Sequence, residues 1–164
     1  MALRSDFHKI IVGRSERLDF VDTAIEGVPA KVDSGAYRSA VHASSIVEHD
    51  GVVSFVLLGN HPVCGEMAHE MSTDDFRVVT VANSFGHQEN RYEVALKVKL
   101  GPKVFKAKFT LADRSKKIYP ILLGRTLLNR RFLIDTEQSA VDRIQLKAEY
   151  NIDFPSDEEE GREE

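Results

Sequence analysis

Two alternating apolar segments separated by a short turn constrain the fold of this chain more than any other feature. In residues 92–100 every second side chain is apolar, and the same alternation returns in residues 105–111 after Gly101-Pro102. Alternation with a period of two buries one face of an extended strand, and a glycine–proline pair ends a strand. We therefore expect an antiparallel hairpin whose polar face carries Glu93, Lys97 and Lys99.

Shorter strand-like runs occupy much of the remaining chain, at residues 9–12, 28–32, 52–58, 77–81, 118–123 and 132–134. Short strands at this spacing predict an all-β fold, either a small β-barrel or a sandwich. A short helix is expected at residues 125–131, directly after Gly124. The apolar positions of residues 139–150 fit neither the helical nor the strand period, and the state of this segment is left open.

Length and composition exclude several classes of protein. The 164 residues, of which 42% are hydrophobic, can form one domain with a substantial core. Cys64 is the single cysteine, which excludes a disulfide-rich scaffold. No apolar run approaches the ~20 residues of a membrane-spanning helix, and the first residues lack the pattern of an export signal. We therefore expect a cytoplasmic protein that does not bind membranes.

The charge is concentrated at the C-terminus. Residues 157–164 contain six acids and one base, a net charge of −5, so the total of −4 leaves +1 for residues 1–156. We expect a folded domain at residues 1–155 and an acidic, disordered tail at residues 156–164. The nearly neutral body has no interleaved aromatic and basic residues, so direct binding to nucleic acid is not expected.

Two short motifs could carry chemistry. In the first, the apolar run of residues 28–32 leads directly into Asp33-Ser34-Gly35, which would hold an exposed carboxylate at the end of a rigid strand. Asp-Ser-Gly alone is also an ordinary turn sequence. The second motif, residues 121–125, places bulky apolar residues before Gly124 at the start of the expected helix. A strand followed by Asp-Ser-Gly-Ala, with a later apolar-apolar-Gly, resembles the half-site of aspartic proteases.

Four stretches point to one particular family with this kind of half-site, namely residues 31–43, 111–115, 119–125 and 132–135. In this order they resemble a retropepsin-like family of bacteria and archaea that has long been labelled ATP-dependent zinc proteases. The similarity covers roughly residues 8–140. It implies a small, closed, retropepsin-like β-barrel with one short helix after the apolar-apolar-Gly motif. It also implies an aspartic peptidase.

The chemistry of such a peptidase needs two carboxylates. Two carboxyl groups a few ångströms apart share one proton, so one acts as a base toward water while the other donates to the scissile carbonyl. This chain has one Asp-Ser-Gly, and the nearest imitation, Asp135-Thr136-Glu137, lacks the glycine. The retropepsin mechanism then requires a homodimer with Asp33 from each copy. In a differently built dimer, Asp33 would work with another group, for which the candidates are Lys31, Arg91 and Arg125.

The resemblance also assigns roles to single residues. Asp33 is the expected catalytic carboxylate, with Ser34 and Gly35 shaping its loop, and Leu122, Leu123 and Gly124 are expected to support it. Members of the family often accompany a ligase that adds glutamates to a ribosomal protein, which implies a peptidase that trims such glutamate tails. A basic rim suits an acidic peptide. The expected substrate contacts are Lys31, Ala36, Arg38, His42, Arg91, Arg114 and Arg125. The alternative for His42 is a buried, hydrogen-bonded histidine that holds the loop.

No cofactor is expected. The chain has no His-Glu-x-x-His, and His61, Cys64 and His69 do not form a recognisable metal-ligand spacing. It also has no glycine-rich phosphate loop, so neither zinc nor ATP is implied. The alternative to the peptidase is a catalytically silent module of the same fold that binds an acidic or ribosomal partner. A solvent-accessible Asp33 would favour the enzyme, and burial of Asp33 in a salt bridge would favour the binding module.

Overall fold

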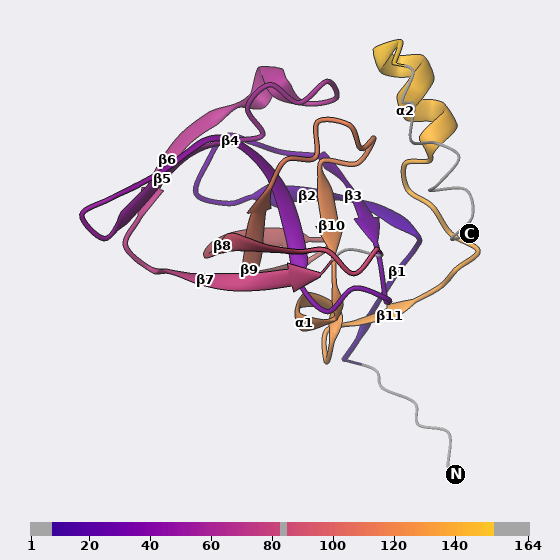
Figure 1. Ribbon diagram of the computed structural model, residues 1–164. Helices are drawn as coiled ribbons and strands as arrows, with labels where there is room; N and C mark the ends of the chain where they lie inside the picture. The colour runs from indigo at the N-terminus through magenta and orange to yellow at the C-terminus, as the bar shows by residue number, and fades with distance from the viewer. Residues whose placement is uncertain (1–7, 83–84, 153–164) are drawn as a thin grey trace.

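The computed structural model describes residues 8–82 and 85–152, and its centre is a closed barrel of six strands (Figure 1). Around the barrel the strands follow the order β10, β3, β2, β8, β9 and β4, and β4 pairs with β10 to close the ring. Their bounds are β10 Ile121–Leu123, β3 Val28–Val32, β2 Ser15–Phe20, β8 Gln88–Leu100, β9 Lys103–Ala112 and β4 Ser39–His49. The expected all-β fold with a closed barrel is therefore confirmed.

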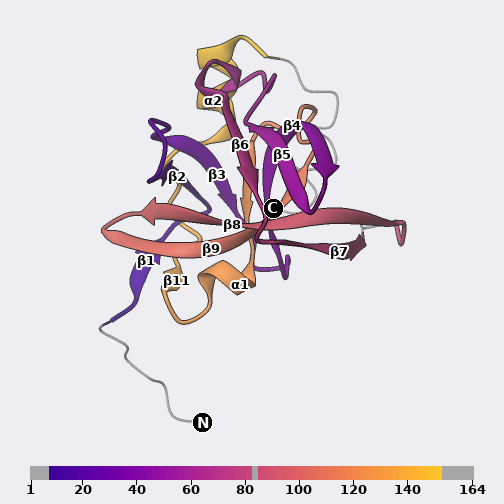
Figure 2. The same ribbon diagram turned by 90° about the vertical axis from the view of Figure 1, so that its left-hand side faces the viewer.

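Two hairpins and a separate small sheet extend from the barrel (Figure 2). The long β4 continues into β5 (Val52–Leu57), which pairs with β6 (His69–Thr73). The first half of β8 pairs with β7 (Phe76–Ala82). Below the barrel, β1 (Ile10–Val12) and β11 (Phe132–Ile134) form a two-stranded parallel sheet.

The helices are short. The helix α1 (Arg125–Leu128) follows Gly124 as expected. The segment whose state was open contains the helix α2 (Arg143–Tyr150). Asp142 caps its N-terminus, because the Asp142 carboxylate accepts the Gln145 N–H at 2.7 Å. A single 3₁₀ turn covers Gly65–Met67. Among the described residues, no helix is long and apolar enough to cross a membrane.

The expected hairpin is confirmed, since β8 and β9 pair antiparallel across the turn at Gly101, where φ is +58°. The side chain of Glu93 is an exception to the expected pattern, because it is only 3% exposed and not on a solvated face. The strands β2, β4 and β6 were not predicted. The first five residues of β4 are all buried, so that strand shows no alternation.

The apolar residues form two clusters. The larger fills the barrel and includes Leu18, Phe109 and Ile121, which are completely buried. The smaller lies where α2 meets the loops before β10 and after β5, and it contains Val63, Ile118, Tyr119, Val141 and Leu146. The expected boundary at residue 155 and the acidic tail lie outside the described residues.

Candidate active site

Asp33 lies where the two predicted motifs meet. The strand β3 runs parallel to β10, with Lys31 beside Leu122 and Val32 beside Leu123. The pairing continues one residue further, because the N–H of Asp33 donates to the carbonyl of Leu123 at 2.9 Å. The barrel therefore brings together two motifs that are about ninety residues apart in the sequence. Leu123 is completely buried at this junction, and Leu122 is partly buried.

The carboxylate of Asp33 is partly exposed and lightly bonded. Its Oδ1 accepts the N–H of Gly35 at 2.9 Å. Within residues 8–82 and 85–152, no ion pair involves Asp33, and its Oδ2 has no hydrogen-bond partner. A carboxylate held at one oxygen and open at the other can accept a proton from water or donate one to a carbonyl. This is the environment that the enzyme interpretation requires of Asp33.

The loop of residues 33–38 is held against the start of α1. The N–H of Arg125 donates to the carbonyl of Ala36 at 2.8 Å, and the N–H of Thr126 donates to that of Tyr37 at 3.0 Å. A Cβ atom on Gly124 would lie 2.5 Å from the carbonyl oxygen of Arg38, so only glycine fits there. A Cβ atom on Gly35 would meet only Oδ1 of Asp33, at 3.1 Å. Of these two glycines, Gly124 is thus the one that close packing requires.

Two arginines flank an exposed tyrosine beside Asp33. The guanidinium of Arg125 donates to the carbonyl of Ser34 at 2.9 Å and lies 5.8 Å from the centre of the Tyr37 ring. The guanidinium of Arg38 lies 5.5 Å from the same ring, and Tyr37 is 59% exposed. Cations at these distances from an aromatic ring attract it. Lys31, Ala36, Arg38 and Arg125, four of the expected substrate contacts, therefore lie next to Asp33 or on its loop.

A buried carboxylate that the sequence did not identify lies behind this loop. Oε2 of Glu93 pairs with the Arg38 guanidinium at 2.7 Å, and Oε1 pairs with the Arg77 guanidinium at 2.7 Å. No sequence signal identifies Glu93, because the alternation puts it on the same side as Lys97 and Lys99. Arg91, an expected substrate contact, lies two residues along β8 and pairs with Glu89 instead of with the Asp33 loop.

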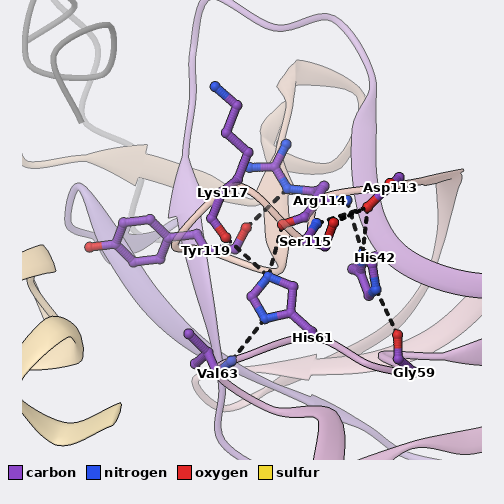
Figure 3. Close-up of polar contacts among 9 residues, drawn as sticks. All are labelled: His42, Gly59, His61, Val63, Asp113, Arg114, Ser115, Lys117 and Tyr119. Atoms are coloured by element: carbon purple, nitrogen blue, oxygen red, sulfur yellow. Dashed lines mark hydrogen bonds and ion pairs between the residues drawn. The ribbon is translucent and has the colours of Figure 1, made fainter. Parts of the chain in front are cut away.

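His42 is a buried histidine that is hydrogen-bonded within the protein (Figure 3). It is 3% exposed, and its Nδ1 accepts the N–H of Arg114 at 2.9 Å. Its Nε2 therefore carries the proton and donates to the carbonyl of Gly59 at 2.7 Å. Both ring nitrogens have partners in the protein, so His42 connects the loop after β9 to the loop after β5.

Arg114 belongs to the same cluster and is not brought beside Asp33. Its Nε donates to the carbonyl of Tyr119 at 3.0 Å. The N–H of His42 donates to Pro120, at the opposite end of β10 from the Leu123 carbonyl that binds Asp33. These two carbonyls are three residue steps apart along the chain, about 10 Å at the rise of an extended strand. The contact of Arg114 with a substrate stays a prediction.

His61 completes this cluster. Its Nδ1 accepts the N–H of Val63 at 3.1 Å, and its Nε2 donates to the carbonyls of Arg114 at 2.9 Å and Lys117 at 3.0 Å. Burial, assisted by the neighbouring His42, lowers the pKa of His61 from 6.5 to about 4. A neutral His61 thus fixes the loop of residues 113–119.

A pocket of about 300 Å³ opens next to this cluster. Polar residues make up much of its lining, among them Ser44, Ser45, Asn60, Asp113 and Ser115. Hydrogen bonds from Ser115 lower the pKa of Asp113. No residue of the Asp33 loop lines this pocket, so it is separate from the candidate active site.

The remaining candidate groups do not suggest different chemistry. Among the described residues, no three histidine, cysteine, aspartate or glutamate side chains gather as a set of metal ligands. Cys64 is buried, and burial raises the pKa of its thiol to about 12. A thiol with this pKa stays protonated at neutral pH and is a poor nucleophile.

Comparison with known proteins places this site in a family context. Residues 11–145 match the RimB-like family model, described as retropepsin-like aspartic endopeptidase RimB. The chain is 31% identical over 140 residues to a probable alpha-L-glutamate ligase of Shewanella pealeana, an alignment that covers 80% of this chain and 30% of the ligase. A probable alpha-L-glutamate ligase of Desulfotalea psychrophila is 32% identical over 141 residues, covering 81% of this chain and 29% of the ligase.

The fold is also similar to that of a solved structure. It is a Legionella pneumophila protein of unknown function, which is 26% identical to this chain and has a TM-score of 0.60. The match covers 79% of this chain and 95% of the Legionella chain. The chain spans only about 30% of the length of the ligases that it matches. The family model, by contrast, matches most of the chain, including both motifs around Asp33. The chain therefore belongs to the RimB-like family of retropepsin-like aspartic endopeptidases.

Proposed function

We propose that this protein is an aspartic peptidase in which Asp33 from each of two copies forms the catalytic pair. The observation that carries the proposal is the environment of Asp33, which is partly exposed at the junction of the two motifs and has no ion pair among the described residues. Family membership supports the same chemistry.

In the proposed reaction, the two Asp33 carboxyl groups share one proton. The ionised carboxylate takes a proton from a water molecule as the water oxygen attacks the peptide carbonyl. The protonated carboxyl donates its proton to the carbonyl oxygen. Collapse of the tetrahedral intermediate breaks the C–N bond, and the amine leaves with a proton from the carboxyl that had accepted it from water. The hydrogen bond from Gly35 to Oδ1 fixes the orientation of each carboxylate.

The proposed second copy has a suitable surface in the small sheet of β1 and β11. Ile11 and Leu133 are register partners on the same face of this sheet, and they are 58% and 47% exposed. Within the described part of the chain, no third strand joins the sheet. Open strand edges with exposed apolar side chains favour association. We propose that a second copy covers this face, because one copy supplies only one Asp-Ser-Gly.

The proposed substrate is a glutamate tail on a ribosomal protein. The curated relatives are named as probable alpha-L-glutamate ligases, which supports a role in the metabolism of glutamate chains. Arg125 is exposed next to Asp33 and can position a substrate carboxylate. Arg38 is less suited to this role, because Glu93 already neutralises it.

Mass spectrometry of a glutamate-tailed ribosomal protein tests the proposal. The wild-type protein should remove glutamates, and Asp33→Asn should remove none. Asp113→Asn is the matched control, because Asp113 is a motif carboxylate whose side chain is 80% exposed and lies away from Asp33. The Asp113→Asn variant should cleave normally. Equal cleavage by wild type and Asp33→Asn would refute the role of Asp33. Binding without cleavage by the wild type would favour the silent module.

A further inference from the structure

Glu93 is a buried carboxylate that the proposed reaction does not use directly. Its side chain is 3% exposed, and its two oxygens each bind a different arginine at 2.7 Å. A buried charge is tolerated only when it is paired and hydrogen-bonded, and such a pair is screened less by solvent than an exposed one. The pairs of Glu93 with Arg38 and Arg77 are therefore screened less than an ion pair between two exposed side chains.

Glu93 lies in a row of residues that crosses four strands to the base of β4. Arg77 of β7 is its register partner on one side, Thr110 of β9 is its partner on the other, and Thr110 in turn pairs with Ala40 of β4. The hydroxyl of Thr110 donates to the carbonyl of Ser39 at 3.2 Å. Glu93 is therefore fixed in the sheet at the level where the Asp33 loop enters β4.

A continuous series of contacts leads from Glu93 back to the residue after Asp33. Glu93 binds the guanidinium of Arg38, and the ring of Tyr37 lies near both Arg38 and Arg125. Arg125 then donates to the carbonyl of Ser34 at 2.9 Å. Glu93 is thus connected through Arg38 and the exposed ring of Tyr37 to the turn beside Asp33.

We propose that Glu93 is a positioning residue that acts through Arg38 to hold the Asp33 loop in its reactive geometry. The inference rests on the proposed peptidase function for its effect on the reaction. A shared proton requires two carboxylates at a fixed separation, and displacement of a catalytic group by about 1 Å can cost a large factor in rate. Arg77 binds the same carboxylate but does not belong to the loop, so it provides the matched control.

Three variants separate the contribution of Glu93 to the loop from its contribution to the fold. Glu93→Gln removes both ion pairs, Arg38→Gln removes only the pair to the loop, and Arg77→Gln removes only the pair to β7. Hydrogen exchange is measured by NMR at the amides of Arg125 and Thr126, which donate to the loop carbonyls. We expect exchange to be at least about tenfold faster in Glu93→Gln and Arg38→Gln, the factor for loss of one charged hydrogen bond, and nearly unchanged in Arg77→Gln.

The kinetic parameters of the same variants provide the second measurement. Loss of positioning should lower kcat by about tenfold or more while KM changes little, and Arg38→Lys should restore part of the loss because it keeps the charge. Equal effects of Arg77→Gln and Arg38→Gln would overturn the proposal, as would unchanged exchange at both amides. If Glu93→Gln does not fold, the comparison of Arg38→Gln with Arg77→Gln decides the proposal. In Arg38→Gln the buried Glu93 still has its ion pair with Arg77. The exchange measurement needs no activity, so failure of the peptidase proposal is distinguishable from failure of this one.

Discussion

Replacement of His61 by glutamine should make the protein less sensitive to mild acid. His61 is 3% exposed and accepts one hydrogen bond from Val63 at Nδ1, an arrangement that protonation of the ring would break. Burial lowers its pKa from 6.5 to about 4. Between these two values the unfolded chain binds a proton that the folded protein does not. Stability is therefore lost as the pH falls below about 6.5, and the loss continues until about 4.

The magnitude follows from the two pKa values. Each unit of difference corresponds to about 1.4 kcal/mol, so His61 destabilises the native state by about 2 kcal/mol at pH 5 relative to pH 7, and by about 3 kcal/mol at most. The chain has no tryptophan, so urea unfolding is followed by far-ultraviolet circular dichroism. His61→Gln should lose about 2 kcal/mol less than wild type between pH 7 and 5. His69→Gln, at an exposed position on β6, is the control. Identical pH dependence of wild type and His61→Gln would refute the reasoning.

Three further predictions concern other sites. Cys64 should resist a thiol reagent at mildly alkaline pH until urea unfolds the protein, because burial raises its pKa to about 12, and rapid labelling of the folded protein would contradict this. Gly124→Ala should lower the free energy of unfolding by about 1–3 kcal/mol, because its Cβ would lie 2.5 Å from a backbone carbonyl oxygen. Gly35→Ala should cost less, and equal costs in urea unfolding would contradict the packing argument. Ile11→Asp should dissociate the proposed dimer in sedimentation experiments, whereas Ile144→Asp, at an 82% exposed position on α2, should not.

The sequence predicts most of the strands that alternate or that end in a clear turn. It fails for β4, because the first five residues of that strand are buried on both faces and show no period. It also leaves α2 open, because only Leu146 of that helix is buried and one position defines no period. The cap at Asp142 and the left-handed Asn151 mark its two ends more clearly than its apolar residues do.

Part of the candidate site could likewise be predicted from the sequence, and part could not. The approach of Asp33 to Leu123, and of its loop to Gly124, was predictable because the resemblance to an aspartic-protease half-site implies that the two motifs meet. The role of Glu93 was not predictable, because it depends on two residues that are distant in the sequence. Arg38 lies in the loop before β4, and Arg77 lies on β7. His42 had two interpretations from its place in the first motif, a substrate contact or a buried, hydrogen-bonded histidine that holds the loop. Tertiary contacts occupy both of its ring nitrogens, as the second interpretation expects.

Mixing active and inactive subunits is the most direct test of the central claim that two copies of Asp33 form one catalytic pair. Wild type is equilibrated with Asp33→Asn at constant wild-type concentration, and the removal of glutamates from the tailed ribosomal protein is then measured. With an equal amount of the variant, about half of the wild-type subunits acquire an inactive partner, so activity should fall to about half. It should fall further, to about a quarter, at a threefold excess of the variant. Activity that does not change at any ratio would contradict a shared carboxylate pair.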